Sequence, residues 1–209
     1  KDCEWGIFDY SQQEPRLVVH YASLRHFTGA GKFVDSYQED ETTDFHTMVS
    51  EMADIPRKQA KTINLGLFYG MGKGKLMSQL GVNLETASEL LASYNERVPF
   101  VKQLMNDTMN KAGKKGYLST LEGRRCRFDQ WEPTNEWGQK SLPLAEAQQQ
   151  YGEHMIKRAW TYKALNRLIQ GSAADQTKKA MLELDKEGYL AHIQVHDELD
   201  FSVASDADK

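Results

Sequence analysis

The chain has 209 residues and a net charge of −4, and 40% of its residues are hydrophobic and 27% charged. This length suits one large domain or two modest ones, and the composition excludes a collagen, a coiled coil and a disordered tail. The sequence starts at Lys1 without an initiator Met, and its last residues carry no helical stop signal. We therefore expect a segment of a longer polypeptide.

Charge is distributed unevenly along the sequence. Seven acids and no Lys or Arg lie between Phe33 and Pro56, whereas six bases and one acid lie between Lys111 and Arg127. Because local fields attract a polyanion, the negative sum does not exclude a nucleic-acid partner. Two solvated surfaces are the plainer alternative for charge runs alone.

The printed sequence shows no segment typical of a membrane helix or a signal peptide. No apolar run approaches the ~20 residues of a membrane helix, and the first ten residues do not form a signal peptide. Two cysteines, Cys3 and Cys126, are typical of a reducing compartment. We expect a cytoplasmic protein with no membrane partner.

The first half of the chain is predicted to be helical after one strand. Strand-forming residues predict a strand over 4–10, and apolar residues at helical spacing predict a helix over 13–24. Gly29 and Gly31 mark a loop. Further helices are predicted over 43–53 with Thr43 or Asp44 as cap, over 57–71, from Asn83, and from Pro99 to near Gly113.

The second half mixes hairpins with helix. Residues 117–120 and 126–128 predict a hairpin, residues 129–143 are irregular with Trp131 and Trp137, and residues 146–184 are predicted to be mostly helical with a break near Gly171. Two alternating strands over 190–196 and 198–203 meet at Asp197.

Two aspartates stand at the ends of predicted strands. Asp9 ends the first strand, and Asp197 lies in the triplet His196-Asp197-Glu198 between the last two. If two such carboxylates came within ~4 Å they would repel by roughly 4 kcal/mol, and a divalent cation removes that cost. Two ions ~3.5–4 Å apart form the clamp used in phosphoryl transfer, and oxygen ligands suit Mg²⁺. Either aspartate alone is more often a turn residue.

The helix over 57–71 carries Arg57, Lys61, Leu65 and Tyr69 four residues apart. Each step of four advances ~400° on a helix, so these side chains follow one slowly turning face. Cations followed by a flat aromatic surface match the needs of a triphosphate with a base attached. A solvated basic face is the alternative.

Other chemistry is weakly supported. The glycine run at Gly70, Gly72 and Gly74 lacks the spacing of a phosphate loop and follows a helix, so it indicates a helix stop and a flexible loop. No His or Cys spacing indicates zinc, and Ser11 has no nucleophile-elbow glycines around it.

Three segments together resemble a known family. Residues 9–16 (DYSQQEPR) closely resemble motif A of the family A DNA polymerases, the bacterial DNA polymerase I type also found in phages. Residues 57–71 resemble motif B and residues 195–198 (VHDE) motif C. Residues 116–125 and 169–175 also look like segments of this family. The order is that of the family, and the likeness covers nearly the whole chain.

The resemblance implies a catalytic centre with two Mg²⁺ ions. Asp9 and Asp197 would be the metal-binding carboxylates, with the Tyr10 carbonyl as a further ligand. Glu198 would assist near the metals, and His196 would lie near the primer terminus.

The resemblance also implies a nucleotide site. Glu14 would be the steric gate that occupies the space of a ribose 2′-OH. Arg57, Lys61 and His46 would contact the triphosphate, with Lys61 donating a proton to pyrophosphate, and Tyr69 would stack at the templating position.

Further positions complete the implied site. Leu65 occupies the nucleotide-stacking position, where the family usually has Phe or Tyr, and this departure favours a phage member. Gln12 and Arg16 would support the nucleotide and DNA contacts. Asn166 and Gln170 would touch the primer–template duplex in its minor groove.

The implied fold is α+β, a right-hand polymerase palm of a small antiparallel sheet with helices, plus helical fingers. Residues 1–30 and 115–209 would be palm, and residues 31–114 fingers. An insertion near 128–160, longer than in compact bacterial enzymes, would be a surface excursion packed by Trp131 and Trp137. A thumb and any 3′–5′ exonuclease would precede Lys1, so we expect this piece alone to be weak or inactive.

The implied function is template-directed DNA synthesis from dNTPs on primer–template DNA, in the cytoplasm of a bacterium or a phage-infected host. A single-subunit RNA polymerase, a non-catalytic polymerase-derived DNA-binding subunit and a two-carboxylate glycosidase are the alternatives. Glu14 and the triplet 196–198 argue against the first. The presence of Asp9, Asp197 and Lys61 argues against the second, and the basic face argues against the third.

Overall fold

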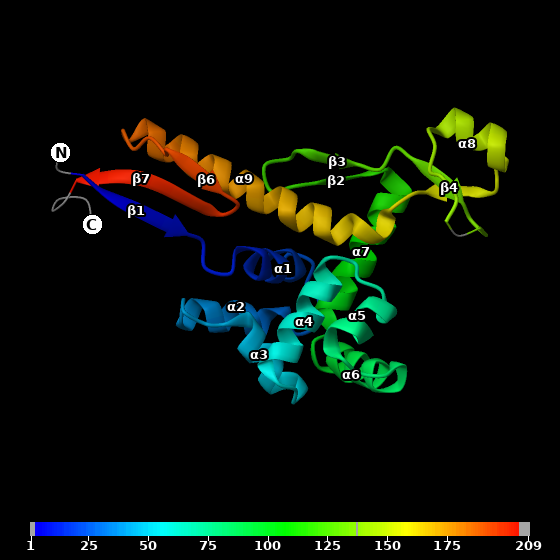
Figure 1. Ribbon diagram of the computed structural model, residues 1–209, viewed down its shortest axis with the longest axis horizontal. Helices are drawn as coiled ribbons and strands as arrows, with labels where there is room; N and C mark the ends of the chain where they lie inside the picture. The colour runs from blue at the N-terminus through cyan, green and yellow to red at the C-terminus, as the bar shows by residue number, and fades with distance from the viewer. Residues whose placement is uncertain (1–2, 137, 205–209) are drawn as a thin grey trace.

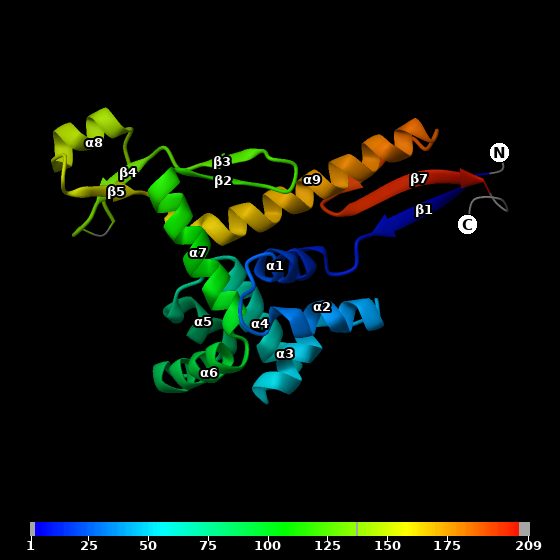
Figure 2. The same cartoon turned by 180° about the vertical axis from the view of Figure 1, so that it is seen from behind.

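The computed structural model describes residues 3–136 and 138–204. Figures 1 and 2 show a long helix, α9 (Ala164–Lys186), that runs from a sheet at one end of the molecule to a small lobe at the other. A group of shorter helices lies along one side of it. Among the described residues, none of the helices combines the length and apolar composition needed to cross a bilayer.

The first half of the chain begins with one strand and continues as seven helices. These elements are β1 (Cys3–Asp9), α1 (Gln13–Ser23), α2 (Ala30–Glu39), α3 (Phe45–Ala53), α4 (Arg57–Phe68), α5 (Lys73–Leu80), α6 (Leu84–Arg97) and α7 (Pro99–Lys115). Capping residues set two of the starts, because the side chains of Asp44 and Asn83 accept hydrogen bonds from the N–H groups of Thr47 and Thr86.

The second half contains short strands before and after α9. They are β2 (Tyr117–Ser119), β3 (Arg125–Arg127), β4 (Trp131–Pro133), α8 (Leu144–Tyr151), β5 (Ile156–Arg158), the 3₁₀ turn η1 (Thr161–Lys163), and, after α9, β6 (Ile193–Val195) and β7 (Glu198–Ala204). The strands form antiparallel sheets of order β1-β7-β6, β2-β3 and β4-β5. The expected α+β class is confirmed.

Two apolar clusters hold these elements together. The larger one has an aromatic centre, in which Phe33, Phe45, Phe68 and Phe100 come from α2, α3, α4 and α7. Their neighbouring ring centroids lie 5.0–5.9 Å apart. The smaller cluster packs one face of β7 against the C-terminal part of α9. The sheet is thus attached to the helical body through α9 and α1.

Most of the predicted elements are confirmed, but two helices were missed. Helix α2 occupies the stretch after Gly29, where a loop was expected, because Ala30, Phe33, Val34 and Tyr37 have helical spacing and contact the core. Helix α5 occupies the expected flexible loop, where Gly72 precedes the first residue and Leu76 is buried.

The prediction that residues 146–184 are mostly helical was wrong for residues 152–163. Gly152, with φ 90°, follows the end of α8, and β5 and η1 intervene before α9 begins. The predicted break at Gly171 was also wrong, because α9 continues through it. A Cβ at Gly171 would lie 2.8 Å from Cγ2 of Thr120, so the glycine lets the β2–β3 hairpin pack on the helix.

The lobe over 128–160 is a hairpin of β4 and β5 with α8 inserted between the strands. Trp131 is half-buried and the guanidinium of Arg158 stacks 4.5 Å from the centroid of its ring. Trp137, the second expected packing residue, lies outside the described residues.

Candidate functional site

Backbone pairing places three acidic residues, Asp9, Asp197 and Glu198, at one end of the β1-β7-β6 sheet. Asp9, the last residue of β1, is paired with Glu198, the first residue of β7. The backbone N–H of Tyr10 donates to the carbonyl oxygen of Asp197 at 3.3 Å. Antiparallel pairing therefore brings residues nearly 190 positions apart in sequence to one sheet edge.

The turn that carries Asp197 is strained. His196 and Asp197 form a two-residue connection between the paired residues Val195 and Glu198, and His196 has φ 56°. Non-glycine residues in this region cost about 1–3 kcal/mol and persist where the surroundings over-determine them. Packing of β7 on α9 supplies that support, so the turn holds Asp197 at the sheet edge.

Oxygen donors at this edge suit a hard cation. Asp9 is exposed and Asp197 half-buried, and Tyr10, whose carbonyl is a further oxygen donor, directly follows Asp9 in the sequence. Carboxylate and carbonyl oxygens with water or phosphate are the usual Mg²⁺ environment. Among the described residues, no three His, Cys, Asp or Glu side chains form a complete metal-binding group by themselves.

A cleft of about 660 Å³ opens beside the turn. It is lined by Gln13, Glu14, Tyr69, Gln170, Ala173, Ala174, His196 and Asp197. The end of α4, the start of α1, the middle of α9 and the β6–β7 turn thus enclose one space. Five of the residues expected at the site lie around it.

Tyr69 crosses this cleft to Glu14. Its hydroxyl donates to Glu14 Oε2 at 2.8 Å. Burial, followed by the hydrogen bond and the charge of Glu14, raises the pKa of Tyr69 to about 12. The phenol is therefore protonated at neutral pH and serves as the donor that fixes the Glu14 carboxylate.

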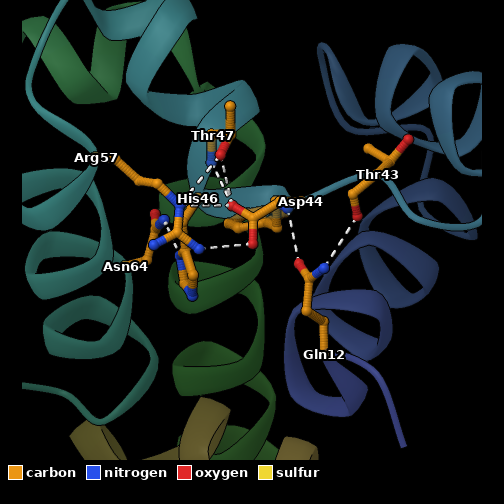
Figure 3. A network of polar contacts seen from close by, with 8 residues as sticks. Gln12, Thr43, Asp44, His46, Thr47, Arg57 and Asn64 are labelled. Carbon is orange, nitrogen blue, oxygen red and sulfur yellow. Dashed lines mark hydrogen bonds and ion pairs between the residues drawn. The ribbon is translucent and has the colours of Figure 1, made fainter.

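The basic face of α4 begins with an ion pair. Arg57 Nε and Nη2 donate to Asp44 Oδ1 and Oδ2 at 3.1 and 2.8 Å, and Asp44 also accepts from Thr47 (Figure 3). Partial burial raises the pKa of Asp44, but the bonds from Arg57 and Thr47 outweigh it and lower the pKa to about 2. The carboxylate therefore stays charged. Lys61, one turn further along α4, is exposed.

His46 lies behind this face with 7% of its surface exposed. Burial lowers its pKa, as do the charges of Lys61 and Arg57, while Asp44 opposes them. Its Nδ1 is 2.8 Å from Asn64 Nδ2 (Figure 3). The ring is therefore predominantly neutral at neutral pH.

Gln12 and Arg16 join α1 to the segment that precedes α3. The Gln12 side-chain amide accepts from the Phe45 N–H at 2.8 Å and donates to the Thr43 carbonyl at 3.0 Å (Figure 3). Arg16 donates to the carbonyls of Ser11 and Glu41. Both side chains thus connect the start of α1 to residues 41–45, and the DNA contact expected for Arg16 stays a prediction.

Asn166 and Gln170 lie one turn apart on α9, with Asn166 half-buried and Gln170 exposed in the cleft. Leu65 is half-buried on α4, between Lys61 and Tyr69. The site residues therefore occupy three groups: the sheet end, the cleft and the α3–α4 face.

Sequence comparison settles the family. Residues 1–209 match the family model described as DNA polymerase family A. The chain belongs to this family. As a family A polymerase chain, it is 38% identical to the DNA-directed DNA polymerase of Pseudomonas phage M6 over 240 aligned residues, which cover 95% of this chain and 33% of the relative.

Bacterial relatives and a solved structure agree with this assignment. DNA polymerase I of Rhizobium leguminosarum is 34% identical over 93% of this chain and 18% of its own length. The POL domain of Pol1 from M. smegmatis, in complex with DNA primer-template and dNTP, superposes with a TM-score of 0.72 at 29% identity, covering 97% of this chain and 34% of that chain. The family A chain thus spans about a fifth to a third of the length of these relatives.

Sequence reasoning missed three residues that support the α3–α4 face. Asp44 was expected only as a cap, and Asn64 and Tyr94 were not expected at the site. Tyr94 donates to Asn64 Oδ1 at 2.5 Å, and Asn64 contacts His46. These contacts join residues 13 to 30 positions apart, and a pattern along one helix does not reveal them.

Proposed function

We propose that this chain is the catalytic segment of a DNA-directed DNA polymerase. Its reaction is Mg²⁺-dependent transfer of a nucleotide from a dNTP to a primer 3′-OH on a DNA template, with release of pyrophosphate. The observation that carries the proposal is the cleft in which Asp197, Glu14, Tyr69 and Gln170 face one another. Its walls supply the Asp197 carboxylate, the Glu14 carboxylate and the Tyr69 ring, and Asp9 lies outside this lining, at the sheet end next to the turn that carries Asp197.

Asp9, Asp197 and the Tyr10 carbonyl would hold the metal ions, with Glu198 beside them. Two bound Mg²⁺ ions would supply charge stabilisation for the transfer. The primer 3′-oxygen forms a bond to the α-phosphorus as the bond from that phosphorus to the pyrophosphate oxygen breaks. Lys61 donates a proton to the pyrophosphate, and His196 lies near the primer terminus.

The α4 face and the cleft hold the incoming nucleotide. Arg57, Lys61 and His46 contact its triphosphate, and Leu65 covers its base. Glu14 excludes a ribose 2′-OH because the hydrogen bond from Tyr69 fixes its carboxylate in the cleft. Tyr69 stacks at the templating position.

In the proposed domain division, residues 1–30 and 115–209 are palm and residues 31–114 are fingers. Gln12 and Arg16 connect the two at α1. Asn166, Gln170 and Arg16 face the DNA duplex.

Primer extension tests the function. In Mg²⁺, the intact protein is expected to extend a DNA primer with dNTPs at least about 100-fold more efficiently than with rNTPs, because a fixed Glu14 makes a 2′-OH clash. A preference for rNTPs would favour an RNA polymerase. DNA binding without extension would favour a non-catalytic subunit.

Leu65→Phe tests the nucleotide-stacking position. A ring face adds roughly 0.5–1.5 kcal/mol of stacking over an aliphatic contact, so we expect incorporation up to about tenfold faster and altered selection against dideoxynucleotides. Single-turnover incorporation of dNTP and ddNTP measures both quantities. Unchanged values for both would remove Leu65 from the nucleotide site.

A further inference from the structure

A chain of three buried polar side chains ends at His46. The hydroxyl of Tyr94 on α6 donates to Asn64 Oδ1 on α4 at 2.5 Å, and Asn64 Nδ2 lies 2.8 Å from His46 Nδ1 on α3. Tyr94 and Asn64 are completely buried, and His46 is 7% exposed. A buried polar chain of this kind persists when every member is satisfied.

The chemistry of each group fixes the direction of these bonds. A buried Tyr hydroxyl needs an acceptor, and Asn64 is the acceptor that the described residues give it. Asn64 must therefore present its carbonyl oxygen to Tyr94 and its NH₂ group to His46. An NH₂ group only donates, so His46 Nδ1 must accept, and the ring proton of neutral His46 must sit on Nε2.

We propose that Asn64, oriented by Tyr94, is a positioning residue that holds His46 in its Nε2–H tautomer, with this N–H as a donor to the incoming triphosphate. The inference rests on the proposed function for the phosphate contact. It goes beyond that function because neither Asn64 nor Tyr94 touches substrate. Both act through His46.

Because the surroundings of His46 favour a neutral ring, its tautomer decides which nitrogen can donate a hydrogen bond. Asp44 favours its charged form, whereas burial, Lys61 and Arg57 disfavour it and lower the pKa of the ring. An imidazolium would donate from both nitrogens, whereas a neutral ring donates from one. With the wrong tautomer, a buried lone pair would face an anionic phosphate, which is repulsive.

Tyr94→Phe is the decisive variant because it removes one oxygen and keeps the ring that fills the core. Without the hydroxyl, the Asn64 amide is free to turn over and accept from Nδ1–H, so both tautomers become populated. We expect the KM for dNTP to rise about three- to tenfold while kcat changes less than twofold. Histidine ¹⁵N chemical shifts, assigned with His46→Gln, are expected to change from pure Nε2–H to a mixture.

Tyr37→Phe is the matched control. Tyr37 is a half-buried tyrosine whose hydroxyl oxygen is buried, and this hydroxyl has no hydrogen-bond partner among the described residues. Removing that hydroxyl should leave KM, kcat and the His46 spectrum unchanged. In a His46→Ala background, Tyr94→Phe should produce no further change in KM, because its effect passes through His46. If Tyr94→Phe acted by disturbing the packing instead, KM would rise in this background too.

The two levels of the proposal fail differently. If the intact protein does not extend primers, the proposed function fails. Histidine ¹⁵N shifts of pure Nε2–H in the wild type would then still support the orienting role of Tyr94 and Asn64. If extension is normal and wild-type His46 already mixes tautomers, the inference is overturned. It is equally overturned if Tyr94→Phe changes neither the spectrum nor KM.

Discussion

Asp197→Asn is expected to abolish Mg²⁺-dependent primer extension by the intact protein, with a loss of at least about 10³-fold. Asparagine keeps the size and one oxygen of the side chain but removes the negative charge that holds a divalent cation. Charge stabilisation by bound metal is worth several kcal/mol, and each 1.36 kcal/mol is a factor of ten in rate. Asp9→Asn should lose as much, because Asp9 lies at the same sheet end.

Both substitutions should reduce primer extension without weakening DNA binding or thermal stability. Asp9 is exposed and Asp197 half-buried at the edge of the sheet, so neither substitution opens the core. Binding to primer–template DNA and the thermal midpoint should stay near the wild-type values. Asp185→Asn is the matched control, since Asp185 is exposed near the end of α9 and its loss changes the net charge equally. Extension within tenfold of wild type by either site variant would remove that aspartate from the metal site.

The sequence was sufficient for elements whose signals are local. Asp44 and Asn83 cap their helices as their residue types predict, and Asp9 ends a strand as its position indicates. The stretch 144–163 could not be read in this way. Gly152 and Trp160 adopt positive φ there, and which residues do so depends on how the lobe packs against α7.

The site was predictable in part for the same reason. The spacing of residues along one helix predicts which side chains share a face, such as Lys61 and Tyr69. The remaining site residues were predicted from the resemblance of three segments to the family motifs. Contacts between elements were not predictable. The pairing of Asp44 with Arg57 and of Asn64 with Tyr94 depends on how α3, α4 and α6 pack around the aromatic cluster of Phe33, Phe45, Phe68 and Phe100.

The three glycines that follow α4 illustrate the difference between pattern and packing. Gly70, Gly72 and Gly74 look equivalent in the sequence, but of the three only Gly70 has a positive φ, 66°. A Cβ on Gly70 would lie 2.6 Å from the carbonyl oxygen of Tyr162, whereas one on Gly74 would meet nothing within 4 Å. Gly70 therefore lets the end of α4 pack against η1, directly after Tyr69.

Gly70→Ala is accordingly expected to destabilise the intact protein by roughly 2–4 kcal/mol. A left-handed backbone costs an alanine about 1–2 kcal/mol, and the clash with a backbone oxygen adds to it because no rotamer change relieves it. The midpoint of the unfolding transition that includes this segment should fall, by roughly 2–4 °C per kcal/mol if a domain of 150–250 residues unfolds as one unit. Gly74→Ala, inside α5, should be neutral or stabilising by up to about 1 kcal/mol. Circular-dichroism melting of both variants measures the difference, and equal midpoints would contradict the close approach of α4 to η1.

Because the displaced turn adjoins Tyr69, Gly70→Ala should also weaken the hydrogen bond from Tyr69 to Glu14. Discrimination against rNTPs should then fall in Gly70→Ala, an effect that Gly74→Ala should not share.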